Sequence, residues 1–480
     1  MKNTLSCHLV SLGCDKNLVD AEKMLGMLFD DGCTFTDRPE QAELIIVNTC
    51  CFIGDAKEES VNAILEMAEY KKTGKCRVLL VTGCMAERYR EEILDTLPEV
   101  DGVVGTNAYQ DIVDIVHDVL KSSGNPQEDP GYAEADPQRG KAAGMVPEHT
   151  RKMRFEPISE AHFQEQGKAG RVVTTGGHYA YLKIAEGCNK RCTYCIIPYL
   201  RGNYRSVPME ALVSEAERLA ADGVKELILV AQETTLYGTD LYGKKSLPEL
   251  LRRLNAIAGL EWIRILYCYP EEITDELVEA IRDLPKVCHY LDIPIQHASD
   301  HILRRMARKT TRAEITERIQ KLRKEVPDIC LRTTMISGFP GETDADHQIL
   351  LEFIREMEFD RLGDFTYSRE EGTKAAAFSH QVSKRLKEER RGEVMLLQQK
   401  IAFQKAERRV GQRLRVIIEG RVTDAEGDGN VYAARTYLDA PGVDGYLYVN
   451  TGRREFMTGD MPFVRVTAAN EYDLIGELCD

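Results

Sequence analysis

The sequence predicts an α/β protein with an N-terminal parallel βα domain, a partial (β/α) barrel and a small C-terminal antiparallel β-barrel. Strand-like apolar runs alternate with amphipathic helical patterns over residues 5–121, and a second such series covers about 171–380. Alternating patterns of this kind indicate parallel sheets covered by helices. After residue 411 the pattern changes to short strands separated by Gly, Asp and Pro, as in small antiparallel barrels.

The first predicted domain, residues 3–121, contains four βα units. Each apolar run has the length of a buried strand, and each is followed by a segment with helical periodicity. The strands are expected at 7–12, 44–48, 78–82 and 100–104, and the helices at 16–30, 56–72, 86–96 and 109–121.

Residues 122–170 interrupt this rhythm. They are rich in Gly, Pro, Ser and charged residues and nearly free of large apolar ones, which predicts a flexible linker. The barrel is then expected at 171–382, a connecting helix at 383–410 and the small β-barrel at 411–480. Active sites of such (β/α) barrels lie at the carboxyl ends of the strands. The six barrel strands are expected at 178–186, 226–231, 262–267, 290–296, 330–337 and 361–368.

The composition is that of a soluble globular protein. The chain has 480 residues, of which 43% are hydrophobic and 29% charged, and this length suggests two to four domains. The mean hydropathy is −0.34, and no stretch approaches the roughly 20 apolar residues of a membrane span. The first residues lack the pattern of a signal peptide, so a cytoplasmic location is expected.

The charge balance indicates which class of molecule the protein binds. The chain carries 63 basic and 78 acidic residues, a net charge of −15. A general nucleic-acid binder is usually basic, so this balance favours a basic protein partner or a small substrate and leaves room for locally basic sites. The predicted helix at 383–410 is one such site, because residues 384–409 contain nine basic and four acidic residues. It would either contact ribosomal RNA or pair with the small C-terminal barrel.

Three of the 14 cysteines form a compact motif. Cys188, Cys192 and Cys195 follow a predicted strand with the spacing C-x3-C-x2-C. A short loop of this kind can direct three thiolates to three irons of a [4Fe–4S] cluster and leave the fourth iron open to a small ligand. The alternatives are a structural zinc, which usually takes four ligands in C-x2-C pairs, and buried thiols.

This loop resembles that of the radical S-adenosylmethionine (SAM) enzymes. The resemblance implies that SAM binds the open iron and is cleaved there to methionine and a 5′-deoxyadenosyl radical. Residues at the ends of later predicted strands fit the same barrel and are expected to contact SAM. These residues are Gln232, Glu233, Gln296, Gly338 and Gly341. The two glycines would allow the backbone to approach the flat adenine closely, although turns between strands and helices favour glycine as well.

A second set of cysteines lies in the first domain. Cys14, Cys50 and Cys84 each stand at or just past the end of a predicted strand, one βα period apart. The carboxyl ends of parallel strands share one edge of a sheet, so these thiols are expected to form a shared metal site. The alternative is three buried structural cysteines. Cys51 is adjacent to Cys50 and could be confused with it, and the remaining cysteines are interpreted as structural.

The two cysteine sets together resemble the methylthiotransferase family, which joins a second [4Fe–4S] cluster, a radical SAM barrel and a C-terminal TRAM barrel, a domain similar to the OB-fold. The resemblance covers nearly the whole chain apart from the predicted linker. The motifs closest to the ribosomal-protein branch, RimO, are SLGCDKNLVDAEKMLG, NTCCFIGDAKEES, GCNKRCTYCIIPYLRG, DIPIQHASD and GFPGET. Val207 departs from the family, which often has arginine there.

The resemblance implies a substrate and partners. Members of this branch insert a methylthio group at the β-carbon of an aspartate in small-subunit ribosomal protein S-twelve, with two SAM molecules per turnover. The implied partners are that protein, free or in the ribosomal subunit, a reduced flavodoxin- or ferredoxin-type electron donor, and a sulfur donor. No catalytic residue beyond the cluster ligands is implied, and no membrane partner is expected.

Two other functions remain as alternatives. A tRNA adenosine methylthiotransferase would use the same two clusters, but its first motif is typically GCQMN where this chain has GCDKN. A non-catalytic iron–sulfur scaffold or RNA-binding adaptor would not need both cysteine sets.

The charge of the tail also favours a protein substrate. Residues 411–480 contain seven arginines, no lysines and twelve acids, a balance of 7 − 12 = −5. An acidic barrel repels phosphates and attracts a basic protein. The predicted contacts are Asp424, Glu426 and Asp428, which cluster in a turn between two predicted strands. The alternative is an ordinary solvated acidic surface.

Overall fold

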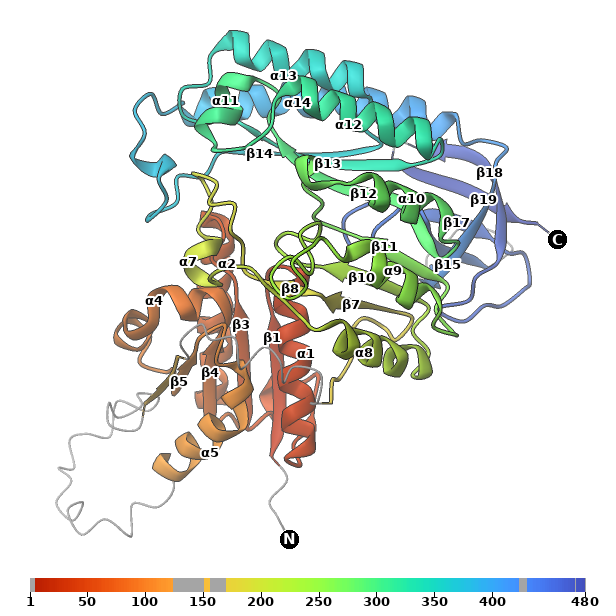
Figure 1. Ribbon diagram of the computed structural model, residues 1–480. Coiled ribbons are helices and arrows are strands. Elements are labelled where there is room, and N and C mark those ends of the chain that lie inside the picture. The colour runs from red at the N-terminus through yellow and green to blue at the C-terminus, as the bar shows by residue number, and fades with distance from the viewer. Residues whose placement is uncertain (1–4, 124–150, 156–169, 423–429, 471, 480) are drawn as a thin grey trace, which may run out of the picture. The chain divides into compact units, whose positions relative to one another are not determined.

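The chain forms two compact units in the computed structural model (Figure 1). The N-terminal unit comprises Met1–Val173 together with Cys195–Asn203, and the barrel unit comprises Thr174–Tyr194 together with Tyr204–Asp480. Within the described residues no helix has the length and apolar character needed to cross a membrane. The described residues are 5–123, 151–155, 170–422, 430–470 and 472–479.

The N-terminal unit is built on a six-stranded parallel sheet in the order β2-β1-β3-β4-β5-β6. The two central strands are mainly apolar and are buried along their whole length, as expected of strands covered by helices on both faces. The predicted parallel βα fold is confirmed. The strands are β1 (Ser6–Ser11), β2 (Thr34–Phe35), β3 (Leu44–Thr49), β4 (Val78–Thr82), β5 (Gly102–Val104) and β6 (Lys152–Arg154). The helices are α1 (Asp15–Asp30), α2 (Gly54–Ala68), α3 (Tyr70–Thr73), α4 (Gly83–Thr96) and α5 (Ile112–Ser123).

Part of the predicted linker has regular structure. Strand β6 lies inside it and pairs in parallel with β5, with Met153 opposite Val103. The side chain of Arg151 anchors this segment, because its Nη1 atom donates a hydrogen bond to the carbonyl oxygen of Leu94 at 2.6 Å. A strand of Lys, Met and Arg carries no apolar signal, which is why the sequence does not predict it. The rest of the predicted linker, 124–150 and 156–169, lies outside the described residues.

A segment far along the chain also belongs to the N-terminal unit. Residues Cys195–Asn203 follow the three-cysteine loop and contain the short helix α7 (Ile197–Leu200). Ile196 and Leu200 are buried in the hydrophobic core of the N-terminal unit. Thr106 Oγ1 donates a hydrogen bond to the carbonyl oxygen of Leu200 at 3.1 Å. This segment is therefore packed into the first sheet's domain.

The barrel unit contains a second parallel sheet of six strands in the order β14-β13-β12-β11-β10-β7. All six predicted barrel strands are present, which confirms the partial barrel. The strands are β7 (Tyr179–Lys183), β10 (Glu226–Val230), β11 (Trp262–Ile265), β12 (Val287–Gln296), β13 (Cys330–Ser337) and β14 (Arg361–Thr366), and β8 (Ala185–Glu186) pairs with β9 (Arg205–Ser206). The helices are α8 (Met209–Ala221), α9 (Leu247–Asn255), α10 (Asp275–Asp283), α11 (Asp300–Arg305), α12 (Arg312–Glu325) and α13 (Asp344–Met357).

The C-terminal strands close into a small barrel, reached through the long helix α14 (Lys384–Glu407). The barrel order is β15-β16-β17-β19-β18, and one of its pairs, β17 with β19, is parallel. The predicted closed barrel is confirmed, but it is not wholly antiparallel, and β19 was not predicted. Its strands are β15 (Arg413–Arg421), β16 (Val431–Thr436), β17 (Leu447–Asn450), β18 (Phe463–Asn470) and β19 (Asp473–Leu478).

A buried ionic network joins this small barrel to the amino ends of the larger barrel's strands. Arg435 of β16 lies with Nη1 2.7 Å from Glu226 Oε2 and Nε 2.6 Å from Glu419 Oε1. Glu226, the first residue of β10, also pairs with Arg264 of β11 at 2.7 Å. The side chains of Glu226, Arg264 and Arg435 are at most 1% exposed. The small barrel is therefore fixed at the strand ends opposite to those where (β/α) barrels carry their active sites.

Candidate functional site

Two cysteines of the three-cysteine loop lie at the carboxyl ends of the barrel unit's strands. Cys188 and Cys192 follow β8 and are both 6% exposed. Cys188 Sγ accepts a hydrogen bond from the backbone N–H of Lys190 at 3.5 Å. Burial raises the pKa of Cys188 to about 11. A thiol in this state becomes a thiolate when a metal binds it, because the positive charge replaces the lost solvation. Cys195 begins the segment that belongs to the N-terminal unit.

Gln232 and Glu233 follow the end of β10, as predicted, and both present unmatched acceptors. Gln232 Nε2 donates to Glu186 Oε1 at 2.7 Å, while its Oε1 accepts a hydrogen bond from no described residue. Glu233 is fully buried, and burial raises its pKa to about 8. Its Oε2 atom also lacks a hydrogen bond from the described residues, and the ammonium of Lys190 is 3.8 Å away. Such buried acceptors suit a polar, cationic ligand.

Charged and aromatic side chains surround the two cysteines. The ammonium of Lys190 contacts Glu272 and lies 3.4 Å from Glu271 Oε1. The guanidinium of Arg308 lies 4.2 Å from the ring centroid of Tyr269. Arg308 is 4% exposed, and its Nε and Nη1 atoms donate to no described residue. This end of the barrel therefore holds unmatched donors as well as unmatched acceptors, a set suited to a zwitterion.

Gln296 ends β12 in a strained backbone conformation. Its φ angle is 77°, which is uncommon for a residue other than glycine, and it is 8% exposed. The next residue, His297, is fully buried, and its Nδ1 atom accepts a hydrogen bond from the backbone N–H of Ser299 at 3.0 Å. In the neutral ring, the proton is therefore on Nε2, which lies 3.7 Å from Glu342 Oε2.

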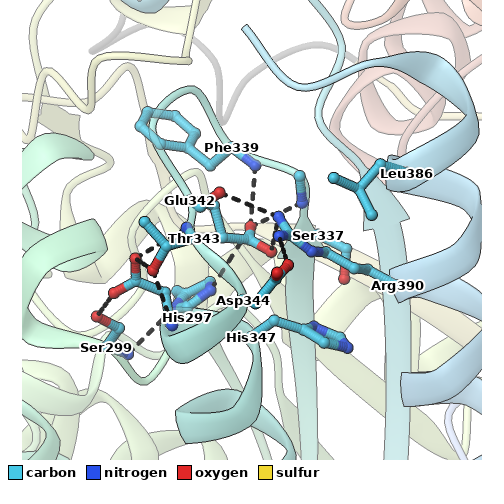
Figure 2. A network of polar contacts seen from close by, with 12 residues as sticks. His297, Ser299, Ser337, Phe339, Glu342, Thr343, Asp344, His347, Leu386 and Arg390 are labelled. Carbon is cyan, nitrogen blue, oxygen red and sulfur yellow. Dashed lines mark hydrogen bonds and ion pairs between the residues drawn. The ribbon is translucent and has the colours of Figure 1, made fainter. Parts of the chain in front are cut away.

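The predicted Gly338 loop follows β13 and is held by Glu342 (Figure 2). Glu342 Oε2 accepts hydrogen bonds from the backbone N–H groups of Gly338 at 2.7 Å and Phe339 at 3.0 Å. Arg390 of α14 donates to the carbonyl oxygen of Glu342 at 3.1 Å and also pairs with Asp344 at 2.7 Å. Burial raises the pKa of Glu342, but His297, Arg390 and the backbone donors together hold it below its usual range.

Neighbouring side chains of the protein leave no room for a Cβ atom at the two glycines of this loop. Gly338 has a φ of 74°, and a Cβ atom there would lie 2.3 Å from Lys387 Cγ of α14. At Gly341 a Cβ atom would lie 2.8 Å from Arg305 Nε. The close approach of these glycines to adenine stays a prediction, and in the structure Lys387 and Arg305 occupy the space that their Cβ atoms would fill.

The second cysteine set gathers at one edge of the N-terminal sheet. Cys14 is the N-cap of α1, Cys50 follows β3 and Cys84 lies in the first turn of α4. Burial raises the pKa of Cys50 and raises that of Cys84 to about 12, and in both cases Cys14 acts as a further neighbouring acid. Gly13 makes room for this arrangement, because a Cβ atom there would lie 2.7 Å from Cys50 Cβ.

Cys51 has a different environment from its neighbour. It is fully buried in the core of the N-terminal unit, and its Sγ atom donates to the carbonyl oxygen of Cys84 at 3.2 Å. This contact supports the structural interpretation of Cys51.

Comparison with known proteins identifies the family. Residues 182–354 match the Radical SAM superfamily, residues 6–105 match the Uncharacterized protein family UPF0004, and residues 410–479 match the TRAM domain. A relative from Lachnoclostridium phytofermentans, named ribosomal protein uS12 methylthiotransferase RimO, is 55% identical over 98% of this chain and 99% of its own. The chain belongs to the RimO family. A protein of the same name from Acetivibrio thermocellus is 47% identical over 98% of this chain and 97% of its own.

Solved structures support the fold of this RimO-family chain. The radical SAM methyltransferase TsrM from Kitasatospora setae, solved with tryptophan and a SAM analogue, matches with a TM-score of 0.50. The match covers 75% of this chain and 73% of TsrM at 16% sequence identity, so it bears on the fold alone.

RimO-family membership implies SAM and one [4Fe–4S] cluster, and the barrel residues fit both. The donors are thiols, and the unmatched polar atoms of Gln232, Glu233 and Arg308 suit the amino and carboxylate groups of SAM. Among the described residues, no three His, Cys, Asp or Glu side chains converge as a single ion requires. A cluster makes no such demand, because each thiolate binds a different iron.

Arg201 of this RimO-family chain lies against the second cysteine set and was not predicted. It is 1% exposed, Nη1 lies 3.1 Å from Asp20 Oδ2, and Nη2 donates to Asn17. The only signal in the sequence is its position six residues after Cys195, which does not reveal the contact. The predicted acidic turn with Asp424, Glu426 and Asp428 lies outside the described residues.

Proposed function

We propose that this protein inserts a methylthio group at the β-carbon of an aspartate in ribosomal protein uS12. The observation that carries the proposal is the match over nearly the whole chain, at 55% identity, to a protein named as a uS12 methylthiotransferase. Both cysteine sets and the TRAM-type barrel lie within the matched length. The matched length therefore includes every domain that the proposed activity needs.

The reaction replaces one hydrogen atom, and this hydrogen is difficult to remove. The β-carbon of an aspartate carries an unactivated C–H bond that no side chain deprotonates readily at neutral pH. One SAM molecule provides the methyl group. When bound, SAM and the [4Fe–4S] cluster would supply the radical chemistry that removes this hydrogen, with 5′-deoxyadenosine as the product. A reduced flavodoxin- or ferredoxin-type protein would deliver electrons, and a sulfide or persulfide donor would deliver the sulfur.

In the barrel unit the proposed role of the residues is to bind and orient SAM. Cys188, Cys192 and Cys195 would hold the cluster, on the basis of their spacing. Glu233 would accept the cationic amino group, because it is buried and has an unmatched oxygen. A cation at this point would also lower its pKa from about 8 and keep it ionised. Gln232, Gln296, Gly338 and Gly341 complete the proposed SAM contacts.

In the N-terminal unit Cys14, Cys50 and Cys84 would hold a second [4Fe–4S] cluster. Three thiols from three consecutive βα turns gather at one sheet edge, and none of them is paired in a disulfide. Thiolates are soft ligands that favour iron–sulfur clusters. With three protein ligands, one iron of this cluster would be open to carry the sulfur that is transferred.

Substrate choice would depend on charge. The tail from 411 to 480 has seven arginines against twelve acids, which suits a basic ribosomal protein better than RNA. The basic helix α14 does not offset this, because several of its cations are already paired within the barrel unit. Lys405 lies 3.0 Å from Asp360 Oδ1, and Arg390 lies 3.0 Å from Glu342 Oε1. We propose Asp424, Glu426 and Asp428 as contacts for uS12.

The proposal is tested by mass analysis of ribosomal proteins and tRNA from cells with and without this gene. The expected result is a methylthio group on one aspartate of uS12 that disappears with the gene. Unmodified uS12 in both strains, with a methylthio-adenosine lost from tRNA instead, would assign the protein to the tRNA enzymes.

A further inference from the structure

Arg201 is a buried cation held in one position. Its Nη1 atom lies 3.1 Å from Asp20 Oδ2, and its Nη2 atom donates to Asn17 Oδ1. Both partners lie in the first turns of α1, whose N-cap is Cys14. A guanidinium that is 1% exposed is costly unless it is paired, so these contacts fix its charge in the interior.

Asn17 connects Arg201 to the turns that carry the other two thiols. Its Nδ2 atom donates to the carbonyl oxygen of Thr49 at 3.0 Å, directly before Cys50. Its Oδ1 atom, which accepts from Arg201, lies 3.7 Å from Cys84 Sγ. The guanidinium is therefore one side chain away from the thiol set.

The positive charge of Arg201 lies near the thiols. A cation in the segment that also contains Cys195 therefore lies close enough to stabilise negative charge at these sulfur atoms, because only the Asn17 side chain separates it from Cys84 Sγ.

We propose that Arg201 is the positioning and electrostatic residue of the Cys14–Cys50–Cys84 site, where its buried charge makes a bound cluster easier to reduce. This inference rests on the proposed function, because it requires a cluster at these thiols. Reduction adds one electron and makes the cluster more negative. A fixed cation in a medium of low dielectric constant stabilises the reduced state and raises the reduction potential.

The test uses the full chain with Cys188, Cys192 and Cys195 changed to Ala, so that only the second site can hold iron. After anaerobic reconstitution this parent protein should contain about four irons per chain. A parent without iron would refute the proposed second cluster itself, before Arg201 is changed. Redox titration followed by electron paramagnetic resonance then gives the reduction potential of the cluster.

Arg201→Gln removes the charge and retains a polar group toward Asn17 and Asp20. We expect this variant to bind as much iron as the parent. At the same solution potential the ratio of reduced to oxidised cluster should be about tenfold lower, which corresponds to a reduction potential lower by 59 mV for one electron. The matched control is Arg77→Gln, which removes an arginine of the same unit whose side chain is 51% exposed. The control should leave the potential unchanged. A potential that is equal in the parent and Arg201→Gln would overturn the proposal.

Arg201→Lys decides the case in which Arg201→Gln fails to bind iron. It keeps the positive charge but cannot form the same two contacts. Retained iron with a potential close to that of the parent supports the electrostatic role. Loss of iron from Arg201→Lys as well, with the apoprotein still folded by circular dichroism, would make Arg201 a purely structural residue and overturn the proposal.

Discussion

Glu342 and Arg390 form a buried ion pair in which Arg390 Nη1 lies 3.0 Å from Glu342 Oε1. The side chains are 0% and 4% exposed, respectively. Glu342 also accepts the backbone hydrogen bonds of the Gly338 loop, so the pair connects this loop to α14. Helix α14, for which the sequence leaves contact with RNA or pairing with the small barrel open, thus stabilises the loop of the proposed SAM site (Figure 2).

Changing Glu342 to Gln should weaken SAM binding while the iron content stays the same. The variant loses a charged acceptor for two backbone N–H groups and leaves Arg390 without its buried partner. Hydrogen bonds to charged groups contribute about 1.5–3 kcal/mol, so at least a tenfold loss of affinity is expected. Equilibrium dialysis of SAM against reconstituted protein measures it. Glu389→Gln, on a half-exposed side chain of α14, is the control, and equal affinities in the two variants would contradict this role.

The second prediction concerns Asp364, which is 3% exposed on β14. Burial raises its pKa to about 7, although Ser337 Oγ donates to its Oδ2 at 2.6 Å. The unfolded chain releases this proton near pH 4, so the folded state binds more protons between about pH 4 and 7. The group's contribution to stability is therefore full below about pH 4 and is lost as the pH rises through that window.

Asp364→Asn should remove this dependence on pH. The free energy of unfolding of Asp364→Asn, relative to that of the parent, should be higher at pH 8 than at pH 5. The increase is about 1.4 kcal/mol for each pH unit between pH 5 and the raised pKa. Urea unfolding of the apoprotein at both pH values measures the difference. Asp283→Asn, on a side chain that is 60% exposed, serves as the control. A parallel pH dependence in the parent and Asp364→Asn would show that Asp364 titrates normally.

The third prediction concerns the network that fixes the small barrel. Arg435→Met leaves Glu226 and Glu419 with fewer partners in the interior, and breaking such buried pairs costs about 3–5 kcal/mol. Arg415→Met is the matched control, because it breaks a surface pair with Glu261 whose side chains are 38% and 37% exposed. Such surface pairs contribute about 0–1 kcal/mol. Denaturant unfolding measures both, and equal losses of stability would refute the role of burial.

The fourth prediction concerns substrate recognition. Replacing Asp424, Glu426 and Asp428 by Asn, Gln and Asn should slow association with uS12 and reduce its dependence on salt. Charges attract over about 8 Å at physiological ionic strength, so the loss should be largest at low salt. SAM cleavage without substrate should be unchanged. The control removes three exposed acids of α4, which are Glu91, Glu92 and Asp95. Association that is unaffected, or equally slowed by the control, would exclude the turn as a contact.

The sequence predicts the central elements because they are buried apolar runs. Strands β3 and β4 each begin with a run of four apolar residues and are fully buried, so the sequence pattern and the burial agree. The strand β6 contains Lys, Met and Arg, and β19 contains three acidic or small residues among its six, so neither has such a pattern. Pairing with a neighbouring strand, rather than their own composition, makes them strands.

Some residues of the proposed site could likewise be predicted from the sequence, and others could not. The cysteines could be predicted because each follows a strand and the strand ends of a parallel sheet share one edge. The roles of Arg201 and Arg390 could not be predicted from the sequence, because their partners lie 184 and 48 residues away in the chain. Arginines are common, and composition does not reveal which of them is buried. Only the packing of distant segments identifies these two.

The central claim is that two cysteine sets perform two tasks on one substrate, uS12. The most direct measurement is mass spectrometry of purified uS12 after anaerobic incubation with reconstituted protein, SAM and reductant, with 5′-deoxyadenosine measured in the same reaction. The parent should add one methylthio group to an aspartate. Changing Cys14, Cys50 and Cys84 to Ala should retain 5′-deoxyadenosine formation and abolish the methylthio group. Changing Cys188, Cys192 and Cys195 should abolish both, and a methylthio group added by the first triple variant would contradict the account.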